Sequence, residues 1–290
     1  MKIGYPCLNY SIGCTANSTF RLRNFTEKRF IDTVKNNIDC LKRILSFNIK
    51  NDILFFRISS DIIPFASHPI CTFDWKNYFE YDFEIIGKMI IENDIRISMH
   101  PDQFVLLNAK NEEIVKRSIK EIEWHCELLD SLNLDEKAKV QIHVGGIYDD
   151  KENSIKRFLK TYSILPRKIK KRFVIENDDR LYSLKDCLRI SKKAKIPIVF
   201  DSFHHNVLNN NESTRDAVID ASKTWKKSDG ILMVDYSSQQ KNSKTGKHSE
   251  HIDIIDFKNF LKITKGIEYD IMLEIKDKEK SALEALKVLK

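Results

Sequence analysis

The hydrophobic and polar positions of this chain follow two alternating periods. Short runs rich in Val, Ile, Leu and Phe recur along it, and each is followed by a longer segment whose apolar residues are spaced three and four apart. The short runs predict buried β-strands, and the longer segments predict amphipathic helices. We predict strands at residues 2–8, 53–59, 96–100, 139–144, 172–176, 196–201, 231–235 and 270–275.

The helical spacing is clearest in residues 25–47, where one apolar stripe contains Phe30, Val34, Ile38, Leu41 and Leu45. Similar stripes run through 74–92, 112–132, 151–164, 183–194, 213–225, 254–264 and 278–289. Repeated strand and helix pairs with nearly continuous apolar strands predict a parallel sheet covered on both faces. Over 290 residues they favour a single-domain TIM-type (β/α)8 barrel spanning residues 1–290, with an open doubly wound sheet as the alternative.

Composition narrows the class of partner. Lys and Arg number 49 against 42 Asp and Glu, and the formal charge of +7 favours a polyanion such as nucleic acid. The six cysteines include no CxxC pair, so their spacing predicts neither a zinc ribbon nor a disulfide framework and favours a reducing cytoplasm. The chain shows no leader and no apolar run near the ~18 residues of a membrane span, so we expect no signal peptide and no membrane partner. The polar segment 237–248 is predicted to be a mobile loop.

Side chains that bind metals gather at the ends of the predicted strands. Five histidines and four carboxylates stand at a strand end or soon after it: His68, His100, His143, Glu176, Asp201, His204, Asp235, His248 and Glu274. In a barrel the carboxyl ends of all strands open on one face, so these side chains are expected to meet in one pocket. In the stretch VFDSFHH, the spacing from Asp201 favours His204 over His205 as the ligand.

This set of side chains predicts a cluster of metal ions. Histidine and carboxylate without thiolate is the ligand chemistry of Zn²⁺, Mn²⁺, Fe²⁺ or Co²⁺, and nine candidates are too many for one ion. We therefore predict two or three divalent ions. Glu176 and Glu274 end the fifth and eighth strands, where their carboxylates could bridge ions in phosphodiester hydrolysis. With His100 and His143 they form the predicted catalytic set.

The succession of motifs resembles one family, the ultraviolet-damage endonucleases. The resemblance runs over nearly the whole chain and rests on IGYPCLN (3–9), RISSDIIPFASHP (57–69), ISMHPDQF (97–104), IHVGG (142–146), IEND (175–178), FDSFHH (200–205), GKHSEHI (246–252) and MLEIKDKE (272–279). It implies a barrel nuclease that recognises photolesions in double-stranded DNA, such as cyclobutane pyrimidine dimers, and cuts 5′ to them, leaving a 3′-hydroxyl and a 5′-phosphate. The sequence leaves open whether 6-4 photoproducts are cut as well. We expect a monomer in the cytoplasm, associated with the nucleoid.

The resemblance also implies roles for single residues. Its metal ligands fall on His68, His100, His143, Glu176, Asp201, His204, His248 and Glu274, and manganese is the ion it implies, whereas ligand chemistry alone leaves Zn²⁺ and Co²⁺ open. Its lesion-contacting residues fall on Tyr5, Asn9, Gln103 and Phe104, the last usually tyrosine in the family. The Gln103 amide would hydrogen-bond the bases left unpaired when the lesion flips out, and the Phe104 ring would stack or wedge beside them.

The seventh strand departs from the family. Where the family presents a lysine that can be carboxylated and then a metal-binding histidine, this chain has Met233 and Asp235. Asp235 can still hold a metal, but Met233 cannot be carboxylated. Three alternatives therefore stay open: a metal-dependent endonuclease for abasic sites, a metal-dependent sugar isomerase on the same barrel, and a lesion-binding module with a degraded cluster. The excess of Lys and Arg over Asp and Glu and the loop with Gln103 and Phe104 argue against the isomerase.

Overall fold

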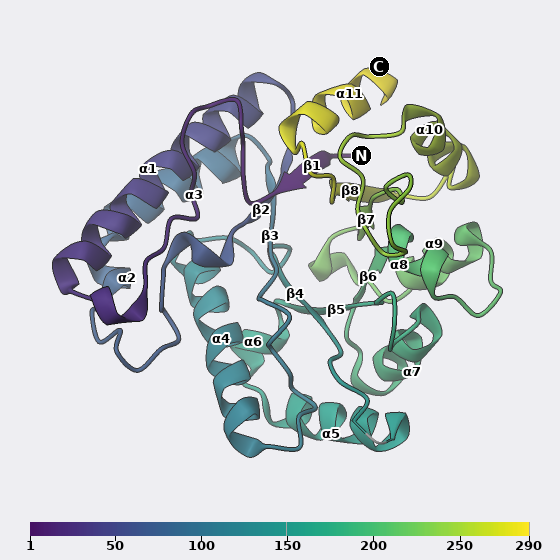
Figure 1. Ribbon diagram of the computed structural model, residues 1–290, viewed down its shortest axis with the longest axis horizontal. Helices are drawn as coiled ribbons and strands as arrows, with labels where there is room; N and C mark the ends of the chain where they lie inside the picture. Colours follow the sequence, from purple (N-terminus) through teal and green to yellow (C-terminus); the bar gives the residue numbers. More distant parts are fainter. Residues whose placement is uncertain (149, 290) are drawn as a thin grey trace.

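Eight parallel strands form a closed barrel in the computed structural model, which describes residues 1–148 and 150–289 (Figure 1). Each strand pairs with its neighbours in sequence, and the last pairs with the first. The strands are β1 (Ile3–Pro6), β2 (Phe55–Ile58), β3 (Arg96–Met99), β4 (Lys139–His143), β5 (Phe173–Glu176), β6 (Ile198–Asp201), β7 (Leu232–Tyr236) and β8 (Tyr269–Leu273). The predicted barrel is confirmed, and the open sheet is wrong.

Helices follow the strands and surround the barrel (Figure 1). The α-helices are α1 (Glu27–Lys50), α2 (Trp75–Tyr78), α3 (Glu80–Glu92), α4 (Glu112–Ser131), α5 (Lys151–Ile164), α6 (Arg167–Lys170), α7 (Leu184–Ala194), α8 (Ser202–Val207), α9 (Thr214–Ser222), α10 (Ile254–Ile263) and α11 (Glu279–Leu289). Short 3₁₀ helices are η1 (Leu22–Asn24), η2 (Ser60–Ile62) and η3 (Lys227–Asp229). Every predicted helical segment contains a helix, and the short α6 and α8 are additions.

Helix α1 shows why the periodic segments fold as they do. The Thr26 hydroxyl caps the helix by accepting a hydrogen bond from the backbone N–H of Arg29 at 3.2 Å. The predicted stripe from Phe30 to Leu45 is buried. Because a helix buries only one stripe, most polar residues between these positions stay accessible to solvent. Asn37 is an exception, since it is buried and its amide donates to the carbonyls of Ser18, Asp61 and Ile62.

The interior of the barrel is filled in layers. Side chains two apart on a strand point to the same side of the sheet, so inward-facing positions from different strands meet inside the barrel. One apolar layer consists of Phe55, Val174, Val199, Met233 and Met272. Met233 therefore packs among hydrocarbon side chains, two positions along β7 from Asp235, and contributes volume to the core.

A disulfide that the cysteine spacing does not predict joins Cys14 to Cys40, with Cα atoms 5.9 Å apart. The two residues are 26 positions apart in sequence, so no local motif marks them. The pair arises because the long loop after β1 returns along α1. The bond ties this loop, which begins near Asn9, to the outer helix layer.

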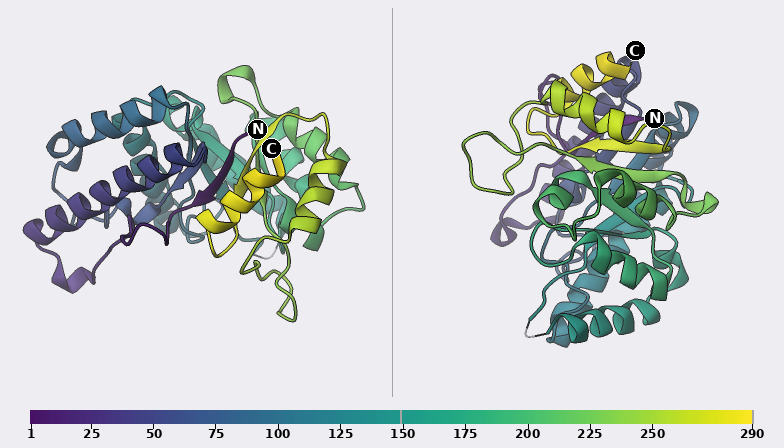
Figure 2. Two further views of the ribbon diagram at one scale, coloured as in Figure 1. Left: turned by 90° about the horizontal axis from the view of Figure 1, so that it is seen from above. Right: turned by 90° about the vertical axis from the view of Figure 1, so that its right-hand side faces the viewer.

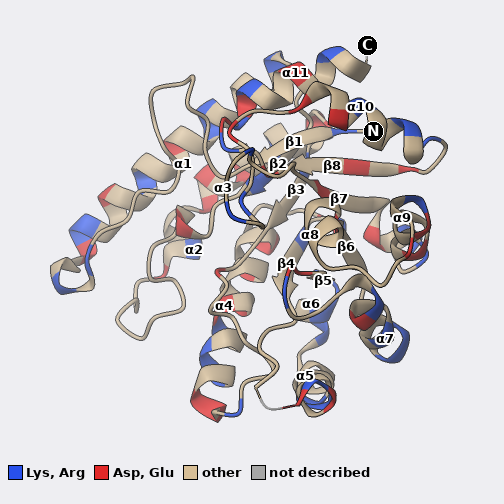
Figure 3. Cartoon of the chain, turned by 45° about the vertical axis from the view of Figure 1, so that its right-hand side comes forward, with Lys and Arg blue, Asp and Glu red and all other residues tan. Residues whose placement is uncertain are grey.

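Charged residues of both signs are interleaved along the outer helices (Figure 3). Such mixed surfaces are ordinary for a globular domain and do not by themselves mark a partner. Within residues 1–148 and 150–289, no helix combines the length and the apolar character that crossing a membrane requires.

Candidate metal centre

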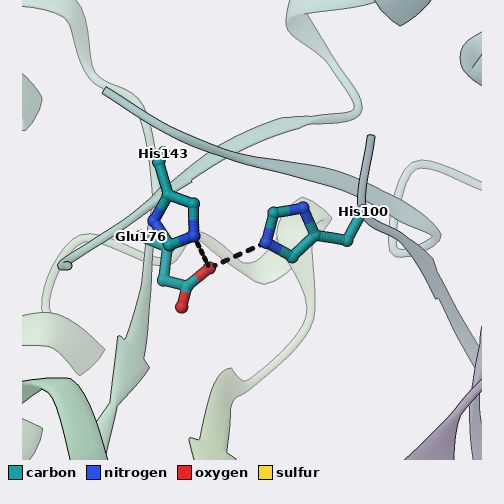
Figure 4. Close-up of side chains that lie close together, drawn as sticks. All are labelled: His100, His143 and Glu176. Carbon is teal, nitrogen blue, oxygen red and sulfur yellow. Dashed lines mark hydrogen bonds and ion pairs between the residues drawn. The ribbon is translucent and has the colours of Figure 1, made fainter. Parts of the chain in front are cut away.

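Three predicted ligands converge at the carboxyl ends of neighbouring strands. His143 and Glu176 are the last residues of β4 and β5 and stand opposite each other in register, and His100 follows β3 directly. The Nε2 atoms of His100 and His143 lie 3.2 Å and 3.7 Å from the same oxygen, Oε2 of Glu176 (Figure 4). Ligand atoms of these three residues lie within 4.8 Å of one another, so the group could hold a metal ion.

A second group forms where β6 passes into the short helix α8. The carboxylate of Asp201 caps this helix by accepting a hydrogen bond from the backbone N–H of His204 at 2.7 Å. The cap turns the His204 imidazole toward the cluster, where its Nδ1 lies 3.2 Å from Oε1 of Glu176. Glu176, Asp201 and His204 make the second group of converging ligands. His205 instead faces Glu212, with its Nδ1 3.9 Å from a carboxylate oxygen.

The third group joins Asp201 to Asp235 on β7 and to Glu274 just after β8. A buried cation lies among these carboxylates. The Arg57 guanidinium of β2 donates to both oxygens of Asp235 at 2.8 Å and also pairs with Glu274. The position where the family presents a histidine is therefore held by Asp235 in a fixed, buried ion pair.

The histidines are oriented by their backbone contacts. A carbonyl oxygen can only accept a hydrogen bond, so an Nδ1 atom that faces a carbonyl must carry a proton. In the neutral ring the lone pair available to a metal is then on Nε2. Three predicted ligands share this arrangement, donating from Nδ1 at 2.9, 3.0 and 2.8 Å: His100 to Pro101, His204 to Asn177, and His248 to Glu274. An acceptor that fixes the far side of the ring in this way is typical of metal-binding histidines.

Burial makes some of these carboxylates hard to ionise. Removal from water raises the pKa of Asp201 well above its ordinary value and raises that of Asp235 to about 7. Burial acts the same way on Glu274, but Arg57 opposes it and lowers the pKa of Glu274 to about 2. Arg57 thus offsets the charge of Asp235 and Glu274, and further cations would stabilise the charged forms of all three carboxylates.

The histidines around Glu176 carry part of that positive charge. Burial opposes ionisation of Glu176, yet His143 and His100 hold its pKa well below the ordinary value. Burial likewise opposes protonation of His204, but Asp201 and Glu176 raise its pKa to about 11. Burial lowers the pKa of His143, whereas for His100 burial is outweighed by Glu176, which raises its pKa. Protons on His100 and His204 therefore balance the buried carboxylates, in positions where metal ions would replace them.

The donor set fits divalent metal ions on a second ground. Oδ2 of Asp201 is buried and has no hydrogen-bond partner among the described residues. Buried polar atoms without partners are rare, and a bound ion is one of the few reasons for them. Together with the converging histidines and carboxylates, this atom makes a site suited to Mn²⁺, Zn²⁺ or Co²⁺.

His68 lies apart from the three groups. It is exposed on the loop after β2, and its Nδ1 accepts a hydrogen bond from the backbone N–H of Ile70 at 3.1 Å. It nevertheless shares with His100 and Phe104 a hollow of about 870 Å³ beside the cluster. His248 lies nearer, because its ring centroid is 6.1 Å from that of His204.

Residues 1–290 match the family described as UV-endonuclease UvdE. The chain belongs to this family. A UV DNA damage endonuclease of Clostridium perfringens (strain 13 / Type A) is 43% identical over 292 residues, which cover 100% of this chain and 71% of the relative. One of Bacillus thuringiensis subsp. konkukian (strain 97-27) is 36% identical over 300 residues, which cover 100% and 94%. The crystal structure of SacUVDE is 47% identical, covers 100% of this chain and 98% of its own, and aligns with a TM-score of 0.96.

Membership in the UvdE family confirms the resemblance seen in the motifs. The chain is an endonuclease that acts on DNA in the repair of ultraviolet damage. The sugar isomerase is thereby set aside, although it would use the same kind of barrel.

The lesion-contacting residues expected in this UvdE protein fall into two environments. Tyr5 is fully buried, and its hydroxyl donates to Asn48 at 2.6 Å and accepts from the buried Asn9 at 2.7 Å. Gln103 and Phe104 are instead exposed on the loop after β3, with 73% of Phe104 accessible. Tyr5 and Asn9 are thus enclosed in the protein, whereas Gln103 and Phe104 are accessible at the surface.

Three further residues of this UvdE site were not singled out from the sequence. Gln141 donates to Oε2 of Glu176 and to Oδ2 of Asp235, both at 2.6 Å, and accepts from Arg57 at 3.1 Å. Asn177 exchanges two hydrogen bonds with the backbone of Asp201 and so fixes the end of β6. A signal existed for Arg57, because it is a polar residue in an otherwise apolar strand.

Proposed function

We propose that this UvdE-family endonuclease recognises cyclobutane pyrimidine dimers and 6-4 photoproducts in duplex DNA and hydrolyses the phosphodiester immediately 5′ to them. The products would be a 3′-hydroxyl and a 5′-phosphate. The observation that carries the proposal is the cluster of histidines and carboxylates at the carboxyl ends of the strands, with exposed Gln103 and Phe104 on an adjoining loop.

The metal ions would be held by the three groups of converging residues. His100, His143 and Glu176 would hold one ion, Glu176, Asp201 and His204 a second, and Asp201, Asp235 and Glu274 a third where three are bound. We propose manganese, as the family resemblance implies. When bound, such ions acidify water and offset the negative charge that develops on a phosphodiester during hydrolysis.

The chain's own residues would orient this chemistry. Gln141 and Arg57 hold the carboxylates of Glu176 and Asp235 in place, so these groups need little reorganisation during the reaction. Gln103 and Phe104 would fill the space left by the flipped lesion, the amide by hydrogen bonding and the ring by stacking. Flipping costs a few kcal/mol and is easiest at a damaged step, which favours lesions over intact DNA.

The function is tested with supercoiled plasmid in the presence of Mn²⁺. We expect ultraviolet-irradiated plasmid to be nicked at least about 100-fold faster than unirradiated plasmid, since intact stacking opposes flipping by a few kcal/mol. The alternative is an endonuclease for abasic sites on the same barrel. Equal nicking of irradiated and unirradiated plasmid, together with rapid cutting of a synthetic abasic site, would favour that alternative.

Replacing Gln103 by alanine is expected to weaken lesion discrimination and to leave metal binding intact. The side chain is exposed and belongs to none of the three ligand groups. We expect the ratio of cleavage rates on damaged and undamaged duplex to fall by roughly tenfold, because interactions with the bases worth about 1–3 kcal/mol are removed. The comparison variant is His100→Ala, which should lose metal and cleavage together. Loss of metal from Gln103→Ala with unchanged discrimination would contradict this division of the loop.

A further inference from the structure

The segment 237–250, here called the lysine hairpin, stands out from the barrel between β7 and α10 (Figure 2). Predicted as a mobile loop, it forms two arms joined by backbone hydrogen bonds. Gln239 and His248 pair as antiparallel neighbours, the N–H of Gln240 donates to Lys247 at 2.8 Å, and that of Ser249 donates to Ser238 at 3.0 Å. The polar sequence therefore has a defined shape.

Side chains brace the tip of the lysine hairpin. The amide of Gln239 accepts from the N–H of Gly246 and donates to the carbonyl of Lys244, both at 2.9 Å. Gly246 has a φ of +86°, and a Cβ atom there would lie 2.8 Å from a carboxylate oxygen of Asp179. The positive φ favours glycine at this position, and the absence of a side chain lets the tip rest closely against the loop between β5 and α7.

The base of the lysine hairpin adjoins the metal centre. His248 donates to the carbonyl of Glu274 at 2.8 Å, and its ring packs against that of Phe203 with centroids 5.0 Å apart. The carbonyl of Ser249 accepts from the N–H of Lys276 at 3.2 Å. Because the first arm leaves the carboxyl end of β7 and the second is bonded to the chain just after β8, the lysine hairpin rises on the same face as the site.

Three lysines spaced three apart, Lys241, Lys244 and Lys247, are exposed on this frame. Lys241 has 87% of its side chain accessible, with Asp253 at 3.9 Å, and the other two lysines make no ion pair within the described residues. The nearby Glu250 is paired with Lys276 at 2.6 Å. The lysine hairpin therefore presents a surplus of positive charge.

Arg180 adds a fourth cation from the loop after β5. Its side chain is 79% accessible, with Asp179 at 3.3 Å, and it lines with Lys244 and Lys247 a hollow of about 530 Å³ against the hairpin tip. Two loops remote in sequence thus bring their positive side chains together. Long, flexible cations around an open hollow suit phosphate groups, which need charge more than fixed geometry.

We propose that the lysine hairpin and Arg180 grip the phosphate backbone of the DNA beside the cleaved site, independently of base sequence and of damage. The proposal rests on the proposed function and deepens it by naming where the undamaged part of the duplex is held. Phosphate contacts of this kind position a protein on DNA, while discrimination stays with the loop that contains Gln103 and Phe104. Each contact between a phosphate and one of these cations should release counterions that were bound to the DNA. The cations are Lys241, Lys244, Lys247 and Arg180.

The test compares the binding of two duplexes that differ only by one thymine dimer, measured by fluorescence anisotropy over a range of KCl concentrations. The variant is Lys241→Gln/Lys244→Gln/Lys247→Gln. We expect the slope of log affinity against log salt concentration to be smaller in magnitude by about 2.7, which is about 0.9 for each of the phosphates no longer neutralised. Raising KCl fourfold would then weaken the wild type about 40-fold more than the variant. Both duplexes should lose affinity by the same factor.

The matched control removes the same charge from the opposite face of the barrel. Lys192, Lys193 and Lys195 are exposed at the end of α7, just before β6 begins, and Lys192→Gln/Lys193→Gln/Lys195→Gln should keep the wild-type slope. If both triple variants reduced the salt-dependence slope equally, only the net charge of the protein would matter, and the proposal would be overturned. A wild-type slope with loss of metal in the hairpin variant would also overturn it, because the hairpin would then only position His248. If the wild type shows no preference for the dimer while the hairpin variant still flattens the slope, the proposed function fails and the grip stands.

Discussion

Replacing Glu176 by glutamine is expected to lower the rate of incision of irradiated DNA by about 10³-fold or more, equivalent to at least about 4 kcal/mol of transition-state stabilisation. Glu176 belongs to two of the three ligand groups and lies within 3.7 Å of three histidine rings. Glutamine keeps the size and one acceptor oxygen but removes the charge. The substitution should therefore lower the affinity for metal ions and disturb the orientation of the imidazole rings.

This prediction is checked by single-turnover cleavage with saturating Mn²⁺ and by elemental analysis of protein purified without chelators. Glu284→Gln is the control, because Glu284 is exposed on α11 and belongs to none of the three ligand groups. Its rate and metal content should equal those of the wild type. Cleavage by Glu176→Gln within tenfold of wild type, with full metal content, would remove Glu176 from the centre. A complete lack of cleavage by the wild type with Mn²⁺ would revive the lesion-binding module.

Replacing Arg57 by methionine is expected to destabilise the metal-free protein by about 3–5 kcal/mol, because removing one partner leaves buried charge uncompensated. Arg57 is 3% exposed and is the cation that faces Asp235 and Glu274. Methionine fills much of the same volume but cannot donate the hydrogen bonds. The free energy of unfolding, measured by urea denaturation in the presence of EDTA, gives the comparison.

A double variant separates the effect of charge compensation from that of packing. Arg57→Met/Asp235→Leu removes both members of the buried pair, so it should recover a large part of the stability lost in Arg57→Met. Arg180→Met serves as the control for an exposed arginine and should change stability by no more than about 0.5 kcal/mol. If the free energy of unfolding of Arg57→Met were within about 1 kcal/mol of the wild-type value, protonation alone would have to neutralise the buried carboxylates.

The parts of the site that were predictable are those with a local signature. His143 and Glu176 end apolar strands, and in a parallel barrel that position alone directs them to one face. His204 could be chosen over His205 because Asp201 stands three residues before it, a spacing that the helix cap of α8 explains. Gln103 and Phe104 were found through the family's motif, and their exposure agrees with a role on the surface.

Other parts had no local signature. Nothing in the run ILFFRIS tells that Arg57 pairs with Asp235, which is 178 residues away in sequence. The Cys14–Cys40 disulfide and the meeting of Arg180 with the lysine hairpin are likewise decided by loops that approach one another in space. The buried Tyr5 joins Asn9 to Asn48 of α1 through hydrogen bonds of its hydroxyl group. The apolar stripe of α1 does not predict this contact.

The sequence by itself determined the order of strands and helices, the barrel they close and the face on which the histidines and carboxylates gather. These features depend on periodicity and on residues a few positions apart, because side-chain direction repeats every two residues in a strand and every 3.6 in a helix. The tertiary structure alone decided which carboxylate faces Arg57, which histidine nitrogen is free and where the cations of the lysine hairpin lie. Such pairings depend on how distant loops pack in three dimensions, and local spacing along the chain does not record them.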